Sequence, residues 1–94
     1  MYFYILIGYF RTANGGLCSE GGYFALDDAK TCKDVAVDLG WMIFDGTESD
    51  ADYPKGCYTS SSSFAEYESA YFNTHSTGSS NSLARQICKP RGKG

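Results

Sequence analysis

Residues 27–44 read DDAKTCKDVAVDLGWMIF, a helix-forming pattern that leads directly into a strand-forming one. Ala29, Cys32, Ala36 and Leu39 recur at steps of three and four, with Val35 beside them. This spacing builds one apolar stripe and predicts a helix over about residues 28–39. The run 41–44 is short and rich in β-formers, which predicts a buried strand immediately after the helix.

Both ends of the predicted helix carry residues that are typical of helix termini. Asp27 or Asp28 can cap the first turn, where a carboxylate also suits the positive end of the helix dipole. Gly40 stands where a left-handed residue commonly ends a helix. Because Cys32 lies on the apolar stripe, a disulfide from it would tie the helix to the sheet.

The cysteine count indicates two disulfides. A chain of 94 residues with 43% apolar residues buries a small core, and such domains are commonly stapled by disulfides. A zinc site would need closely spaced ligands, and this chain has wide cysteine spacings and a single histidine. Three pairings stay open, and the order along the chain favours a nested one, with Cys32–Cys57 inside Cys18–Cys88.

The N-terminal residues 2–10 are apolar at nearly every position. We expect a strand that is buried on both sides, or buried on one side and in an intermolecular contact on the other. The segment lacks the basic start and small-residue cleavage site of an export signal, and it is too short to span a bilayer. We therefore expect a mature segment without its targeting sequence and no membrane insertion. One face of this predicted assembly strand consists of Phe3, Ile5, Ile7 and Tyr9.

Residues 45–52 carry four acids and no base, and Pro54 and Gly56 are expected to close this stretch as a loop. Oxygen ligands in such a loop are a weak calcium candidate. The spacing departs from a calcium loop, since Gly56 stands where a bidentate Glu is expected, so a solvated acidic loop is favoured and no cofactor is expected. The candidate ligands are Asp45, Thr47, Ser49 and Asp52.

The second half predicts strands separated by polar loops. The strands are expected at 56–59, 66–73 and 84–89, with a turn at 60–63 and a loop at 74–82. A helical interpretation of residues 64–71 stays open. The hydroxyl-rich loop can bond its own backbone or offer donors to a sugar. We expect a single disulfide-stapled domain over residues 1–89 and a basic, glycine-rich tail over 90–94.

Composition excludes several classes of function. Eight Tyr, six Phe and one Trp with only 20% charged residues indicate a folded chain. The net charge of −3 argues against nucleic acid. His75 is the single histidine, and no Gly-x-Ser-x-Gly elbow accompanies it, so we expect a non-enzymatic protein.

Three segments resemble a small cysteine-rich module of secreted proteins from algae and other aquatic microbes, which has no settled activity. They are Tyr53-Pro-Lys-Gly-Cys-Tyr58, Tyr71-Phe-Asn-Thr-His-Ser-Thr-Gly-Ser79 and Ile87-Cys-Lys89. More distantly, the helix-borne Cys32 and the Gly-Cys-Tyr strand are similar to PAN/apple domains, adhesion modules with one helix on an antiparallel sheet. The expected fold is therefore α+β, with the helix packed on a small antiparallel sheet and two disulfides.

Two functions follow as expectations. The first is an extracellular recognition or adhesion module that binds a glycan or a protein, since tyrosine gives amphipathic contact area at low entropic cost. Its expected anchors are Tyr23, Tyr53, Tyr58 and Tyr71. The alternative is a structural subunit of an extracellular fibre or coat that assembles through its N-terminal strand.

Overall fold

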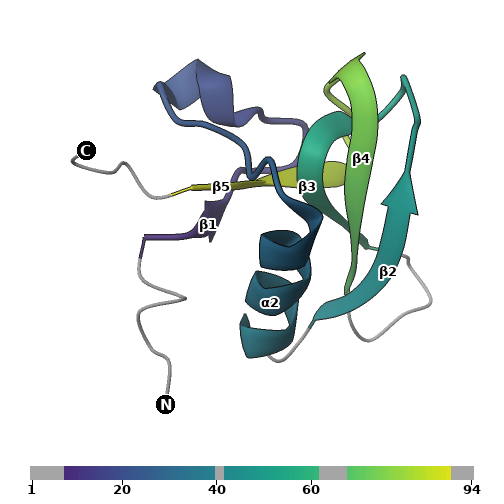
Figure 1. The fold of residues 1–94 in the computed structure, drawn as a ribbon. Helices are drawn as coiled ribbons and strands as arrows, with labels where there is room; N and C mark the ends of the chain where they lie inside the picture. The colour runs from purple at the N-terminus through teal and green to yellow at the C-terminus, as the bar shows by residue number, and fades with distance from the viewer. Residues whose placement is uncertain (1–7, 40–41, 62–67, 90–94) are drawn as a thin grey trace.

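The computed structural model describes residues 8–39, 42–61 and 68–89 (Figure 1). These residues form one α-helix and a five-stranded sheet, so the predicted α+β class is confirmed. The elements are β1 (Phe10–Arg11), the short 3-10 helix η1 (Cys18–Gly21), α2 (Ala29–Leu39), β2 (Met42–Glu48), β3 (Pro54–Ser61), β4 (Glu68–Gly78) and β5 (Ala84–Cys88).

The sheet is larger than the predicted small antiparallel one, and it is mixed. Its strand order is β1-β5-β3-β4-β2, and β2 runs parallel to β4 while the other pairs are antiparallel. The purely antiparallel prediction is therefore wrong. The physical reason is that β4 inserts between β2 and β3, which are consecutive in the chain, so the connection 49–53 must cross the end of β4 (Figure 1).

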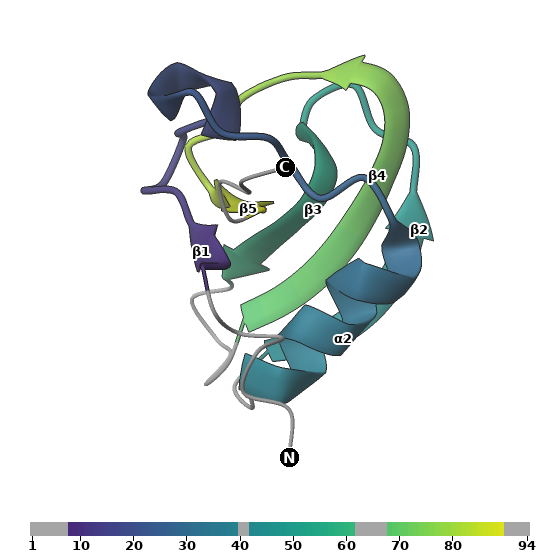
Figure 2. The same ribbon diagram turned by 60° about the vertical axis from the view of Figure 1, so that its left-hand side comes forward.

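The predicted helix is confirmed as α2, which packs on one face of the sheet (Figure 2). Asp28 precedes it, and the Asp28 carboxylate accepts a hydrogen bond from the Thr31 backbone N–H at 2.7 Å. Cys32, Val35 and Ala36 are fully buried against the sheet, as the apolar stripe predicts. The expected terminator Gly40 and Trp41 lie outside the described residues.

Three predicted boundaries are wrong, because polar residues here extend strands. The stretch 45–48 belongs to β2, with an irregularity between Phe44 and Gly46, instead of forming a loop. β3 begins at Pro54 and includes Ser60 and Ser61. β4 continues through 74–78, where the composition predicts a loop. Pairing with a neighbouring strand accounts for 46–48 of β2 and for both ends of β3, whereas within 74–78 only Gly78 is paired, with Pro54. Composition does not reveal such partners.

The remaining strand predictions are partly described. Residues 68–73 are a strand, as the alternating pattern predicts, while 62–67 lie outside the described residues. Of the N-terminal strand predicted at 2–10, the part before residue 8 and the assembly residues Phe3, Ile5 and Ile7 lie outside them as well. Gly8 and Tyr9 are described but belong to no strand, so the strand prediction is wrong there, and β1 begins at Phe10, which pairs with Cys88 of β5. The tail 90–94 is also outside.

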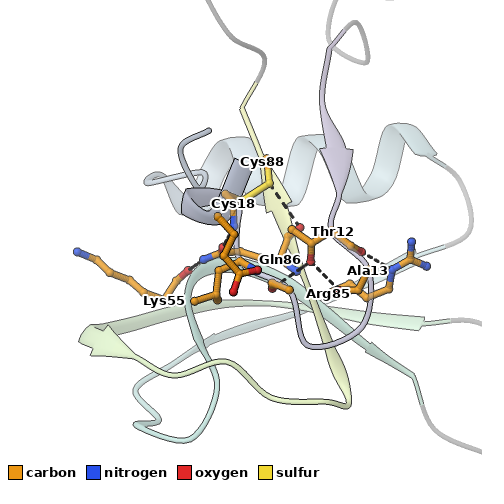
Figure 3. Close-up of a disulfide and its surroundings, with 10 residues drawn as sticks. Thr12, Ala13, Cys18, Lys55, Arg85, Gln86 and Cys88 are labelled. Atoms are coloured by element: carbon orange, nitrogen blue, oxygen red, sulfur yellow. Dashed lines mark hydrogen bonds between the residues drawn. A yellow bond between two sulfur atoms is a disulfide. The ribbon is translucent and has the colours of Figure 1, made fainter. Parts of the chain in front are cut away.

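Two disulfides hold the layers together in a nested arrangement, with Cys32–Cys57 inside Cys18–Cys88. The inner bond joins α2 to β3, and the outer bond joins η1 to β5. The buried side chain of Gln86 reinforces the outer bond: its Oε1 accepts from Cys18 N and its Nε2 donates to Lys55 O, both at 2.7 Å (Figure 3). One amide group therefore links η1, β5 and β3.

Candidate tyrosine site

The structure brings together three of the four tyrosines predicted as anchors. The rings of Tyr53 and Tyr58 stack with centroids 5.2 Å apart, and those of Tyr58 and Tyr71 stack at 5.5 Å. Tyr23 lies elsewhere, with its ring edge-on to Phe10 at 4.8 Å. The candidate site, which we call the tyrosine site, is therefore built on Tyr53, Tyr58 and Tyr71.

Strand register places two of the three rings. Tyr58 on β3 and Tyr71 on β4 are direct cross-strand partners, so their side chains lie on the same face of the sheet. Their chain neighbours Cys57 and Phe72 belong to or pack against the core beneath α2. Since side chains alternate along a strand, the tyrosines occupy the face opposite the helix.

A buried asparagine places the third ring. Asn73 of β4 is 1% exposed, and its Nδ2 lies 2.8–3.0 Å from the carbonyl oxygens of Asp50, Tyr53 and Pro54. Its Oδ1 accepts from the backbone N–H of Asp50 at 2.9 Å and of His75 at 3.1 Å. These bonds fix the 49–53 connection over the end of β4, and Tyr53 is thereby held against Tyr58.

Burial and nearby carboxylates together keep the phenols of the site protonated. The Tyr58 hydroxyl donates to Glu48 Oε2 of β2, and the Tyr58 side chain is only 2% exposed. Burial, and then the bond to Glu48 and its negative charge, raise the pKa of Tyr58 well above its usual value. Burial and the nearby Asp45 likewise raise the pKa of Tyr71. Both phenols therefore stay protonated at neutral pH and act as hydrogen-bond donors.

Beside the stack lies a small hollow with a volume of about 150 Å³, lined by Glu48, Tyr53, Tyr58, Ser60 and Tyr71. Its polar groups are one carboxylate, which accepts hydrogen bonds, and four hydroxyls, which donate and accept. The accessible lining of the hollow is mostly polar. Tyr53 and Tyr71 are half-buried and so expose part of their side chains, whereas the buried Tyr58 offers little area to a ligand. The arrangement combines apolar ring surface with hydrogen-bonding groups within one small site.

The weak calcium candidate does not form the predicted loop. Asp45 and Thr47 are exposed residues of β2, and Ser49 and Asp52 follow in the connection to β3. Asp50 of this connection accepts from the Asp52 backbone N–H at 2.8 Å. Within residues 8–39, 42–61 and 68–89, no three His, Cys, Asp or Glu side chains come together as metal ligands.

His75 has a structural role in β4. Its Nδ1 accepts from the backbone N–H groups of Gly78 at 2.9 Å and Thr77 at 3.2 Å. The backbone at the end of β4 thereby uses the hydrogen-bonding capacity of this nitrogen. Among the hydroxyl and amide side chains of 74–82, the Thr74 hydroxyl donates to Glu48 O at 3.0 Å, and Asn81 Oδ1 accepts from the Leu83 backbone N–H at 2.8 Å.

Sequence reasoning misses three residues of the site: Glu48, Ser60 and Asn73. Glu48 is one of four acids in a predicted loop, and Ser60 falls in a predicted turn. The alternation of side chains along β2 would place Glu48 on the face of the tyrosines only if the pairing of β2 with β4 were known. Asn73 at the end of a predicted strand carries no signal of its own.

No protein-family model, curated protein or solved structure matches this chain. The resemblance to a cysteine-rich secreted module and to PAN/apple domains therefore stays a prediction. In the part of the chain that the structure describes, no helix has the length and apolar character needed to cross a membrane.

Proposed function

We propose that this chain is a non-enzymatic, extracellular recognition module that binds a glycan at the tyrosine site. The observation that carries the proposal is the stack of Tyr53, Tyr58 and Tyr71 beside the Glu48 carboxylate and a polar hollow. The two disulfides are compatible with an oxidising, extracellular setting.

The chemistry of the site suits a sugar. The C–H face of a pyranose packs against an aromatic ring, and the half-buried Tyr53 and Tyr71 offer such rings. The sugar hydroxyls need acceptors and donors at the edge of that contact. Glu48 supplies a charged acceptor, and charge-assisted hydrogen bonds are among the stronger ones. Tyr58 is a positioning residue in this scheme, since its hydroxyl orients Glu48 and its ring supports the two outer ones.

The alternative of a fibre subunit that assembles through its N-terminal strand has less support. Tyr9 packs against the core, and Phe10 pairs with Cys88 within the same chain. The end of the strand that the structure describes is thus used intramolecularly. The opposite edge strand, β2, carries acids and an irregular register, features that protect sheet edges from pairing with another chain.

The proposal is tested by titrating the full chain with soluble cello-, xylo-, manno- and chito-oligosaccharides in a calorimeter. We expect saturable binding to at least one series. Tyr53→Ala and Tyr71→Ala should each weaken that binding about ten-fold, because each loses an aromatic contact worth about 1 kcal/mol together with its hydroxyl.

Tyr23→Ala is the matched control, because it removes a tyrosine side chain that packs with Phe10 and does not line the tyrosine hollow, and its affinity should equal that of the wild type. The glycan proposal is overturned if none of the four series binds, or if Tyr23→Ala weakens binding as much as the two site variants. Size-exclusion chromatography of the same samples tests the alternative, for which regular polymers are expected.

A further inference from the structure

A second hollow, larger than the one at the tyrosine site, lies between the segment before α2 and the strands β3 and β4. Its volume is about 440 Å³, within the range of about 300–1,000 Å³ that is typical of small-molecule sites. It shares no lining residue with the tyrosine hollow. We call it the Phe24 groove, and its main lining residues are Phe24, Leu26, Lys55, Gly56, Phe72 and Lys89.

Backbone contacts build the walls of this groove. Lys89 N donates to Phe24 O at 2.8 Å, and Leu26 N donates to Ile87 O at 3.3 Å, so the segment before α2 is held along the end of β5. On the other side, Gly56 has a φ of +84°, and a Cβ there would lie 2.5 Å from Leu26 O. The groove therefore exists in the folded chain without any rearrangement.

The floor and one rim of the groove are apolar. Leu26 is buried in the core, and Phe72 is half-buried against it. Phe24 is 76% exposed at the rim, although a large aromatic side chain is normally withdrawn from water. Phe24 and Phe72 thus present two rings to whatever enters the groove, and filling it would remove their surface from water.

The charge of the groove is opposite to that of the whole molecule. Two ammonium groups, of Lys55 and Lys89, and one carboxylate, of Asp27, give a net charge of +1, whereas the chain carries −3. Lys89 and Asp27 are 3.3 Å apart and both accessible to solvent, and such pairs contribute little. Within the described part of the chain, the Lys55 ammonium has no ion-pair partner.

We propose that the Phe24 groove binds a small organic anion that carries an aromatic ring, of the arylalkanoate class. The ring packs between Phe24 and Phe72, and the carboxylate lies between Lys55 and Lys89. The groove shares no lining residue with the tyrosine hollow, although Asn73, which lines the groove, also holds the connection that carries Tyr53. The proposal does not depend on glycan binding.

The test is a titration of the ¹⁵N-labelled full chain with 4-phenylbutyrate, followed by ¹H–¹⁵N correlation spectra. We expect saturable shifts at the backbone amides of Leu26, Gly56 and Thr74. The neutral 4-phenylbutyramide should bind about three-fold or more weakly, because it keeps the ring and loses the charge. Lys55→Gln should reduce the affinity for the anion by a similar factor and leave that for the amide unchanged.

Two further variants make the result specific. Phe24→Ala removes an exposed side chain, so the protein should stay folded while binding of both compounds weakens. Lys33→Gln is the matched control: it makes the same charge change on the exposed side of α2, and its affinity should equal that of the wild type. The proposal is overturned if the shifts do not saturate, if they centre on other residues, if the amide binds as tightly as the anion, or if Lys33→Gln and Lys55→Gln weaken binding equally.

Discussion

At the scale of single residues, the contact between Tyr58 and Glu48 links the fold to the candidate site. Tyr58 is the largest fully buried side chain among the described residues, and its hydroxyl is satisfied by the Glu48 carboxylate. A buried phenol with a charged acceptor is stable only while it keeps its proton, since ionisation would place two negative charges side by side. Ionisation of this phenol should therefore disturb the geometry of the tyrosine site at alkaline pH.

The first prediction concerns this alkaline limit. Because the pKa of Tyr58 is raised in the folded chain, its contribution to stability is fully present below its unfolded pKa of about 10 and is lost as pH rises from there toward the folded pKa. Above pH ~10, the free energy of unfolding should fall by up to about 1.4 kcal/mol per pH unit through this group. Urea unfolding between pH 7 and pH 11.5 measures the slope.

Tyr58→Phe is the variant that isolates this contribution. It should be less stable than the wild type by a constant amount between pH 7 and pH 9. The difference should shrink above pH ~10, because a phenylalanine side chain does not ionise, while ionisation of the Tyr58 phenol costs the wild type stability there. The pKa of Tyr71 is also raised, so the free energy of unfolding of the variant should still fall somewhat with pH above pH ~10. Parallel curves for the two proteins up to pH 11.5 would contradict the assignment.

A second residue-scale prediction concerns the start of α2. The Asp28 carboxylate accepts from the Thr31 hydroxyl at 2.6 Å and from the Thr31 backbone N–H at 2.7 Å, and these bonds lower its pKa. Its contribution is thus present above the ordinary pKa of about 3.9 and is lost as pH falls through the lowered value. Asp28→Ala should lower the urea midpoint at pH 7, by an amount that shrinks in strong acid. Circular dichroism at 222 nm follows the transition.

Asp38→Ala provides the matched control for Asp28. It also removes an exposed Asp carboxylate, but near the C-terminal end of α2, where a negative charge faces the negative end of the helix dipole. The midpoint should therefore stay the same or rise. Equal losses in the two variants would mean that general charge effects, and not capping by Asp28, determine the result.

At the scale of elements, the close approach of β3 to the segment before α2 depends on one glycine. Gly56→Ala forces a left-handed backbone on alanine and places its Cβ 2.5 Å from Leu26 O. Gly46 of β2 also has a positive φ, of +116°, and nothing lies within 4 Å of the corresponding Cβ. Gly46→Ala should cost about 1–3 kcal/mol through backbone strain alone.

Gly56→Ala should cost more than Gly46→Ala, because the segment 24–27 must also move. The comparison is made by urea denaturation of both variants at pH 7. The additional loss of unfolding free energy in Gly56→Ala measures how tightly β3 is held against the segment 24–27. If the two variants lose the same free energy of unfolding, the close approach is not maintained in solution and only the backbone strain is real.

The elements differ in how far the sequence alone predicts them. α2 is predictable to within one residue because a helix depends on local spacing and on a cap such as Asp28. β2 and β4 extend through Asp45–Glu48 and 74–78, for which composition predicts loops. Pairing with residues distant in the chain extends them, as Thr47 pairs with Phe72 and Gly78 with Pro54. The parallel pairing of β2 with β4, which lies between β2 and β3 in the sheet, leaves no pattern in the local sequence.

The residue types of the candidate site can be predicted from the sequence, but their arrangement in space cannot. Residue type alone indicates tyrosines as anchors, and the structure brings Tyr53, Tyr58 and Tyr71 together, while Tyr23 packs with Phe10. Which tyrosines meet depends on the register of β3 with β4 and on the crossing held by Asn73. Both are long-range features, and the same is true of Glu48, which reaches Tyr58 from β2.

At the scale of the whole molecule, a small core places much of the stability on the disulfides. Among the residues that the structure describes, seven form the buried cluster between α2 and the sheet, and two of them are Cys32 and Cys57. Small domains are commonly stable by only about 5 kcal/mol, so losing either crosslink should be felt throughout the chain. The two bonds nevertheless act differently, because Cys32–Cys57 lies within the cluster and Cys18–Cys88 lies outside it.

The last prediction ranks the two disulfides. Loop entropy assigns about 4.4 kcal/mol to Cys18–Cys88, with a separation of 70 residues, and about 3.5 kcal/mol to Cys32–Cys57, with a separation of 25. Cys18 and Cys88 are buried too, but they lie outside the hydrophobic cluster. Replacing Cys32 and Cys57 by Ala removes two sulfur atoms from within the cluster, and we expect this to cost more packing energy than the loss of the outer sulfurs, by about 1 kcal/mol or more, which reverses the order. Urea unfolding should therefore find Cys32→Ala/Cys57→Ala the less stable double variant. If Cys18→Ala/Cys88→Ala is instead the less stable by the difference in loop entropy, the inner bond acts only as a crosslink, and α2 is held to the sheet by its other contacts.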